Sequence, residues 1–147
     1  MRVLVQEAPF DLAEETARFA KGEGGSGAIV TFTGVVRDND AGTLSAMEIE
    51  HYPGMTEKAL SEIAQQAVTR FDLQDALVIH RHGRLVPGEQ IMMVATAARH
   101  RRSAFEAAEF LMDYLKSRAP FWKREITSEG EAWVAAKDED EAALNRW

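Results

Sequence analysis

The sequence predicts a single α+β domain, residues 1–147, with a largely antiparallel sheet. Strand-like and helix-like segments follow one another in the order β-α-β-β-α-β-β-α-β-β. Strands that directly follow one another are joined by short connections, which suit antiparallel neighbours and disfavour a parallel sheet with helices on both faces. The length and the 46% hydrophobic content suit one packed core.

The first elements are a strand at Arg2–Gln6 and a helix that ends near Lys21. Asp11 and Glu14 have the spacing of a capping box, which marks the start of this helix. The glycine run Gly22–Gly27 then breaks it. No Gly-Lys-Ser/Thr follows the run, so we interpret it as a flexible turn and not as a phosphate-binding loop.

The next two segments are strands, at Ala28–Val36 and Leu44–Tyr52. The first is rich in β-branched and aromatic residues, which favour a central strand. Gly34 interrupts it and suggests a β-bulge or a close approach of another part of the backbone. The segment Arg37–Gly42 between the two strands has the composition of a turn.

The middle of the chain predicts a helix and two further strands. Apolar residues at the 3.6-residue period extend to Phe71, and we expect Thr56 to be the N-cap of this helix. Ala76–His82 and Gln90–Ala97 then have the composition of strands.

The last long helix is predicted at Ala104–Ser117, with Ser103 and Glu106 as its capping box. Pro120 ends it, because proline disfavours the helical conformation of the preceding residue. Three segments complete the chain: an extended segment at Phe121–Ile126, a hairpin partner at Trp133–Ala135, and a loose terminal helix after the acidic residues Asp138–Glu141.

Composition excludes several classes of function. The chain has no cysteine, which excludes disulfide frameworks, cysteine-ligated zinc or iron–sulfur sites, and a cysteine nucleophile or persulfide carrier. No apolar stretch approaches the roughly 20 residues that span a bilayer, and acidic residues appear too early for a signal peptide. We therefore expect a cytoplasmic protein.

Charge is distributed unevenly along the chain. The net charge is −7, which disfavours nucleic acid or an anionic membrane as a partner of the whole chain. Residues 99–124 nevertheless hold seven basic and three acidic residues, which gives this segment a net charge of +4. The rest of the chain has a net charge of −11. This cationic island suits a small anionic ligand or an acidic partner tail. An ordinary solvated helix face can have the same composition, so local motifs must distinguish a binding site from such a face.

Three consecutive residues, His100, Arg101 and Arg102, come directly before the expected cap at Ser103. Free backbone N–H groups and the helix dipole make a helix N-terminus favourable for anions and unfavourable for cations. Cations at that position lower stability unless an anion neutralises them, so the pattern favours an anion site. The alternative is that the side chains point outward into solvent.

A second unusual pattern places Lys116 and Lys123 on either side of Pro120. A lysine in the last helical turn suits the dipole, so a purely structural role would explain Lys116 alone. If the chain doubles back at Pro120, both lysines can reach one pocket. Neighbouring cations and aromatic rings would lower a lysine pKa there, which suits proton transfer or covalent chemistry with a carbonyl.

His80 and His82 alternate on a predicted strand and so share one face, which is one geometry for two metal ligands. No third ligand follows at a telling spacing. We therefore expect no metal site, and we interpret these histidines as hydrogen-bonded surface residues.

Several motifs together resemble the large, catalytic subunit of molybdopterin synthase, and the resemblance covers nearly the whole chain. The most specific is MDYLKSRAPFWKRE. The motifs are TFTGVVR (Thr31–Arg37), HYPGMTEKAL (His51–Leu60), HRHGRLVPGE (His80–Glu89), HRRSAFEA (His100–Ala107), MDYLKSRAPFWKRE (Met112–Glu125) and the terminal Arg146-Trp147.

This resemblance implies an α/β-hammerhead fold with a smaller β subdomain. It also implies a homodimer with one small ubiquitin-like subunit at each far end, a heterotetramer. The Gly-Gly C-terminal tail of the small subunit would carry a thiocarboxylate into a pocket of this chain. Two sulfurs would pass to cyclic pyranopterin monophosphate, forming the dithiolene of molybdopterin with no further cofactor. A sulfurtransferase without cysteine must receive its sulfur on a partner, which agrees with the composition.

The resemblance also implies catalytic roles for the two lysines. Lys116 and Lys123 fall on the family's key lysines. They would position the thiocarboxylate tail, polarise its carbonyl and assist proton transfer, and a transient covalent bond from Lys116 is one option.

The family's substrate-binding positions correspond to Arg37, His100 and Arg101, which would hold the cyclic phosphate. In the family, the last two can come from the other protomer. Arg124 and Glu125 would complete the wall of the site, with Glu125 orienting the lysine before them.

One position departs from the family pattern. Many members have a lysine where this chain has Val35, two residues before Arg37. The resemblance therefore implies that one substrate contact is missing here or is replaced by Arg102, where a smaller residue is common.

Two other classes of function are compatible with the sequence. A non-catalytic adaptor could use the cationic island to bind an anion or an acidic tail without chemistry, and a fold alone does not exclude this. Nucleic-acid binding is disfavoured by the net charge and by the small extent of the basic region.

Overall fold

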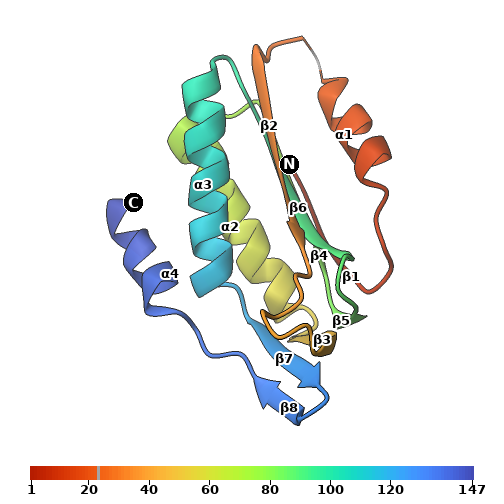
Figure 1. Cartoon of the computed structure of the whole chain (residues 1–147). Coiled ribbons are helices and arrows are strands. Elements are labelled where there is room, and N and C mark those ends of the chain that lie inside the picture. The colour runs from red at the N-terminus through yellow and green to blue at the C-terminus, as the bar shows by residue number, and fades with distance from the viewer. Residues whose placement is uncertain (23) are drawn as a thin grey trace.

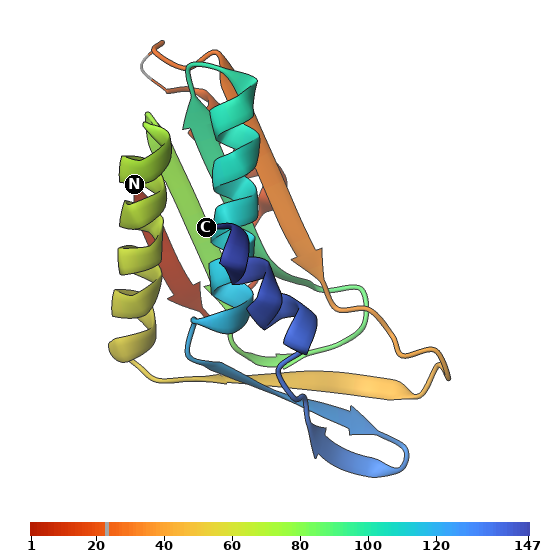
Figure 2. The same cartoon turned by 90° about the vertical axis from the view of Figure 1, so that its left-hand side faces the viewer.

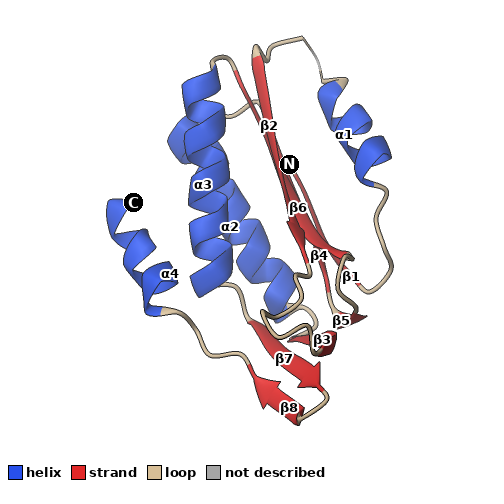
Figure 3. Cartoon of the chain, viewed as in Figure 1, coloured by secondary structure: helices blue, strands red, loops and turns tan. Residues whose placement is uncertain are grey.

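The structure is a computed structural model that describes residues 1–22 and 24–147. These described residues form eight strands and four α-helices, and a 3-10 turn, η1 (Leu144–Arg146), follows the last helix (Figures 1 and 3). The strands are β1 (Arg2–Gln6), β2 (Ala28–Val35), β3 (Leu44–His51), β4 (Asp75–Arg81), β5 (Gly83–Leu85), β6 (Gln90–Ala98), β7 (Phe121–Thr127) and β8 (Gly130–Trp133). The helices are α1 (Leu12–Ala20), α2 (Met55–Phe71), α3 (Arg101–Ser117) and α4 (Asp138–Ala143).

The strands form two four-stranded sheets. The larger has the order β1-β4-β6-β2 and the smaller the order β5-β3-β7-β8. Every pairing except the parallel β1–β4 pair is antiparallel. Figure 2 shows the smaller sheet lying across the lower end of the larger one, beneath α2 and α3. The α+β class, the largely antiparallel sheets and the smaller β unit are therefore confirmed.

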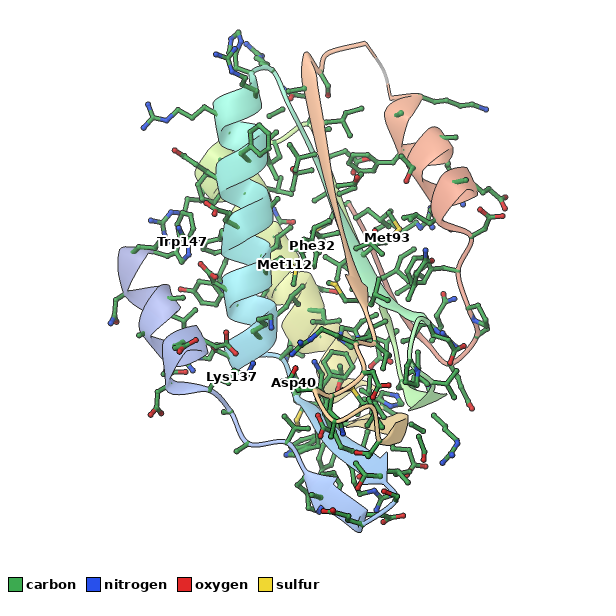
Figure 4. The ribbon with its side chains drawn as sticks, in the orientation of Figure 1. Phe32, Asp40, Met93, Met112, Lys137 and Trp147 are labelled. Atoms are coloured by element: carbon green, nitrogen blue, oxygen red, sulfur yellow. The ribbon has the colours of Figure 1, made fainter. Side chains whose placement is uncertain are left out.

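Helices cover both faces of the larger sheet. On one face α2 and α3 pack side by side, and their contacts include Leu60 and Phe110 against Val78 and Val94. On the other face Phe19 of α1 packs against alternate residues of the same strands, such as Ile79. Figure 4 shows Met93 on the α1 side of the sheet and Met112 on the opposite side.

Several local expectations are confirmed. The N–H of Glu14 donates to the Asp11 carboxylate at 2.9 Å, which caps α1. The register of β2 against β6 shifts between Gly34 and Val35, so the predicted bulge is present. One residue of the predicted Gly22–Gly27 turn, residue 23, lies outside the described residues.

Two expected N-caps are wrong. The last long helix begins at Arg101, so His100 and not Ser103 is its N-cap, and Glu106 pairs instead with Arg102 one turn earlier. Helix α2 begins after Gly54, so Thr56 lies inside its first turn.

Candidate active site

Helix α3 separates the cationic island into two groups at its opposite ends. The first group, here called the helix-start cluster, is Arg99–Arg102. The second is the lysine turn, residues 116–123, which contains Lys116 in the last turn of α3 and Lys123 in β7. Sixteen residues separate His100 from Lys116, which corresponds to about 24 Å along a helix. One chain therefore does not bring these two groups together.

The helix-start cluster is exposed to solvent. The guanidinium of Arg102 is held by Glu106 at 2.9 Å, whereas the His100 side chain makes no capping bond to the part of the chain that the structure describes. The cluster lies beside the start of β2, because the N–H of Gly27 donates to the Ala98 carbonyl at 2.9 Å. A Cβ on Gly27 would lie 2.3 Å from the Arg99 carbonyl oxygen, so only glycine allows this approach.

The lysine turn has a different environment. Lys116 is exposed, whereas Lys123 is half-buried. Burial lowers the pKa of Lys123, and the positive charges of Lys116 and Lys137 lower it further, while Asp140 opposes them. The two sequence-predicted lysines are thus electrostatic neighbours. A lowered pKa makes it easier for a lysine to lose its proton and then to accept one.

The C-terminal segment supplies two charged residues that sequence reasoning missed, Lys137 and Asp140. Both act on the charge of Lys123, although they lie in and before α4. Figure 4 shows Lys137 beside the lower end of α3. This segment is attached to α3 by the bidentate pair of Arg118 with Glu141, at 2.7 and 2.8 Å. No local sequence signal connects it with the lysines.

Glu125 and Lys123 share one face of β7, because alternate residues of a strand point the same way. Lys123 is opposite the buried Ile49 of β3, and Glu125 is opposite Met47. This face is directed toward the core. The predicted proximity of Glu125 to Lys123 agrees with this register.

Arg124 does not belong to the same wall, contrary to expectation. It lies between Lys123 and Glu125 in the strand, so its side chain projects from the opposite face of β7. There it pairs with Glu48 and, at 3.4 Å, with Glu131, and its guanidinium covers the Trp133 ring. We assign Arg124 to the outer face of the smaller sheet.

Arg37 lies just beyond the end of β2, at the same end of the molecule as the lysine turn. Helix α3 follows β6, which is antiparallel to β2, so α3 and β2 run in the same direction. The Arg37 side chain is 84% exposed and forms an ion pair with Asp40 at 3.6 Å. It is free to turn toward a ligand. Val35 is half-exposed on the edge strand beside it.

His80 is buried and not at the surface as expected, and it supports the lysine turn from the larger sheet. Its ring stacks on Phe121 with centroids 3.8 Å apart, and its Nδ1–H donates to the Arg81 carbonyl at 2.7 Å. Burial lowers the pKa of His80 to about 3, and the Lys123 charge acts in the same direction. The imidazole is therefore neutral at physiological pH and adds no charge beside the lysines.

His82 stacks on His51 and not with His80, so the two strand histidines do not form a ligand pair. Among residues 1–22 and 24–147, no three histidine or carboxylate side chains are grouped closely enough to hold a metal ion. Within the same residues, no helix is long and apolar enough to cross a bilayer.

Comparisons with known proteins show which family this chain resembles. A family model described as MoaE protein matches residues 5–118. The curated molybdopterin synthase catalytic subunit of Cereibacter sphaeroides is 69% identical over 147 residues, which is the full length of both chains. A solved MoaE protein from Burkholderia ambifaria is 51% identical and has a TM-score of 0.85, with 99% of this chain and 97% of that one covered.

A more distant neighbour shares the fold. It belongs to a complex of subunits 1 and 2 of the molybdopterin-converting factor from Helicobacter pylori. The TM-score is 0.73 at 19% identity, with 92% of this chain and 90% of that one covered. From the family match and the full-length relative, the chain belongs to the MoaE family, the molybdopterin synthase catalytic subunits, which are sulfurtransferases of molybdenum cofactor biosynthesis.

Proposed function

We propose that this chain transfers sulfur from the thiocarboxylated C-terminus of a small ubiquitin-like subunit to cyclic pyranopterin monophosphate, forming the dithiolene of molybdopterin. One observation carries the proposal: two neighbouring lysines, one with a lowered pKa, meet at a turn in a chain without cysteine. The sulfur is therefore brought in by the partner, and the chain supplies charge and proton transfer. No resident cofactor is needed for these steps, and the setting is the cytoplasm.

The two lysines have different roles in this proposal. Lys116 stands at the negative end of the α3 dipole, which stabilises its ammonium group, and this cation holds the thiocarboxylate and polarises its carbonyl. Lys123 has the lowered pKa and exchanges protons with the reacting groups. Each transfer forms one carbon–sulfur bond at the pterin side chain, from which an oxygen leaves, and a water molecule then cleaves the acyl–sulfur bond, so the tail is released as a carboxylate. Two charged small subunits are therefore consumed for each product.

The partner in this scheme is the small subunit. Support comes from the name of the Helicobacter pylori neighbour, which describes a complex of two subunits of one converting factor. The extended Gly-Gly tail of the small subunit suits a narrow pocket, because glycine has no side chain that would clash with the pocket walls. The thiocarboxylate at the end of this tail is an anion, so the positive charges of the lysines attract it.

We further propose that the active site is shared between two copies of this chain. The helix-start cluster cannot reach Lys116 of its own chain, since about 24 Å of helix separates them. It lies at the start of β2, and Arg37 lies at the end of that strand. β2 is the last strand of its sheet, and Ile29, Phe32 and Val35 are its exposed apolar residues.

An isologous, antiparallel approach of two β2 edges would place the start of one strand beside the end of the other. His100 and Arg101 of one copy would then stand next to Arg37 and the lysine turn of the other, where all of them can hold the cyclic phosphate. Two equivalent sites would result, inside a central homodimer. With one small subunit at each end, the assembly is a heterotetramer.

The experiment is a complementation test with two defective proteins. One copy carries Lys116→Ala and the other carries His100→Ala with Arg101→Ala, each with its own affinity tag. Mixed dimers, isolated through both tags, are supplied with thiocarboxylated small subunit and cyclic pyranopterin monophosphate, and the dithiolene product is measured. A shared site leaves one of two sites intact, so we expect roughly half of the wild-type activity.

Three results would decide against parts of this proposal. Mixed dimers as inactive as the two parent proteins would place each site within one chain. A His100→Ala, Arg101→Ala parent with the wild-type KM for the precursor would remove the helix-start cluster from the reaction. The wild-type protein could also bind the precursor stably and form no product although the small subunit is competent. This result would favour the non-catalytic adaptor.

A further inference from the structure

We propose that Thr56 is a positioning residue that holds the lysine turn in its reactive arrangement. The hydroxyl group of Thr56 ties the start of α2 to the Pro120 carbonyl between the two lysines. This inference rests on the roles proposed above for Lys116 and Lys123.

The contacts of Thr56 are unusual for a residue in the first turn of a helix. The side chain is fully buried. Its Oγ1 accepts the N–H of Tyr52 at 2.9 Å and donates to the Pro120 carbonyl at 3.1 Å, across 64 residues of sequence. Both hydrogen-bonding functions of the hydroxyl group are therefore used, and one of them reaches the lysine turn.

The start of α2 does not need this hydroxyl group as a cap. The Glu57 carboxylate accepts the N–H of Gly54 at 2.6 Å, and the N–H of Lys58 donates to the Gly54 carbonyl at 3.1 Å. These two bonds define the first helical turn without Thr56. The bond to Pro120 is therefore additional to local helix formation.

The lysine turn is held on two sides. Thr56 binds its backbone at Pro120, and the buried ring of His80 stacks on the side chain of Phe121. Within the turn, the N–H of Phe121 donates to the Ala119 carbonyl at 2.8 Å. These contacts fix the point at which α3 ends and β7 begins, so they set the direction in which each lysine projects.

Loss of the Thr56 hydroxyl would leave the Pro120 carbonyl without this donor and release the turn from α2. The side chains of Lys116 and Lys123 would then move apart, and water would reach Lys123 more easily. A catalytic group displaced by about 1 Å can cost up to roughly 10²-fold in rate, so small movements here are sufficient to impair the reaction.

The test compares three substitutions in the full-length protein with thiocarboxylated small subunit and cyclic pyranopterin monophosphate. Thr56→Val removes the hydroxyl and keeps the shape, and Thr56→Ser keeps the hydroxyl. Thr69→Val is the matched control, because Thr69 is an exposed threonine of the same helix, far along it from the lysine turn. We expect a loss of about 10- to 100-fold in kcat for Thr56→Val, and values within about twofold of wild type for the other two.

A second measurement separates positioning from general stability. Titration of ¹³Cε-labelled lysines by NMR reports Lys123 directly, with its signal assigned through Lys123→Ala. In Thr56→Val we expect the Lys123 titration to move upward toward that of an ordinary lysine, with KM for the precursor and affinity for the small subunit unchanged. Thr56→Ser should restore the wild-type titration.

Two outcomes would overturn the inference. One is a folded Thr56→Val protein with wild-type kcat and an unchanged Lys123 titration. The other is a folded Thr56→Ser protein whose kcat is reduced by about 10-fold or more, and this outcome applies whether or not Thr56→Val folds. Activity retained by Lys116→Ala and Lys123→Ala would instead overturn the proposed lysine roles, so the two failures are distinguishable.

Discussion

The two ends of α3 carry similar charges in opposite settings. At the N-terminus, His100 and Arg101 are exposed and stand against the positive end of the helix dipole. At the C-terminus, Lys116 suits the dipole, and Lys123 is half-buried beside it with a lowered pKa. The first group gains stability only when an anion arrives from outside. In the second group only Lys123 is partly enclosed by its own chain, and under the proposed function its lowered pKa suits proton transfer.

This difference teaches how one helix can serve two functions. A cation cluster that opposes the dipole acts as a binding surface, because an incoming phosphate removes an unfavourable interaction. Under the proposed function the lysine pair carries the chemistry, because burial, and then the neighbouring positive charges, lower the pKa of Lys123. Four measurements test this division, from the largest expected effect to the smallest.

Lys116→Ala should abolish most of the turnover. Removing one preorganised cation from a developing negative charge commonly costs about 10²–10³-fold in kcat, and we expect a loss of this size. Product formation with competent small subunit is the measurement. Lys21→Ala, at the end of α1 on the other side of the sheet, is the control and should keep normal activity. An active, folded Lys116→Ala protein would contradict the assigned role.

His100→Ala combined with Arg101→Ala should mainly weaken substrate binding. Charge-assisted contacts to a phosphate contribute to binding, so we expect KM for the precursor to rise about 10- to 100-fold with a smaller change in kcat. Steady-state kinetics at several precursor concentrations separate the two constants. Arg102→Ala is the matched control, because Glu106 already holds that guanidinium. An equal rise in KM for Arg102→Ala would assign the phosphate to Arg102 as well.

Lys123→Met should make the protein inactive and more stable. Folding disfavours the charged form of Lys123, so an apolar side chain of similar length relieves a cost at neutral pH. We expect the melting temperature to rise by about 2–4 °C, the effect of roughly 1 kcal/mol in a domain of this size. The gain should vanish near about pH 11, where lysine is neutral in the unfolded chain too. A lower melting temperature at neutral pH would contradict the burial argument.

The smallest effects concern the C-terminal segment. Lys137→Gln removes a positive charge that lowers the Lys123 pKa, so that pKa should rise. Asp140→Asn removes a negative charge that raises it, so the same pKa should fall. NMR titration of ¹³Cε-labelled lysine measures both shifts. Shifts of the same sign in the two variants would show that the segment acts through packing and not through charge.

The sequence predicted most elements because their signals are local. Strand composition, helical periodicity and the Asp11 cap depend on neighbouring residues, and these elements appear where expected. Thr56 was misassigned because its hydroxyl is committed to Pro120, a contact across 64 residues. The short strand β5 (Gly83–Leu85) was missed because it exists only through pairing with β3.

In the candidate site, too, contacts between residues far apart in the chain could not be predicted from the sequence. The lysines on either side of Pro120 were identified from residue type and from a family motif, and the structure brings them together electrostatically. Arg124 was placed on the wrong side because strand register, and not residue type, decides which face a side chain occupies. His80 had no local signal for its contact with Phe121, since only the packing of the two sheets creates it.

The buried imidazole beneath the site also gives the protein a built-in sensitivity to acid. In the folded chain the pKa of His80 is lowered to about 3, whereas in the unfolded chain the same ring takes up a proton near its ordinary value of 6.5. Between these two values the unfolded chain binds more protons, so its population grows as the medium becomes more acidic. The same ring that supports the turn at neutral pH thus weakens the whole fold during acidification.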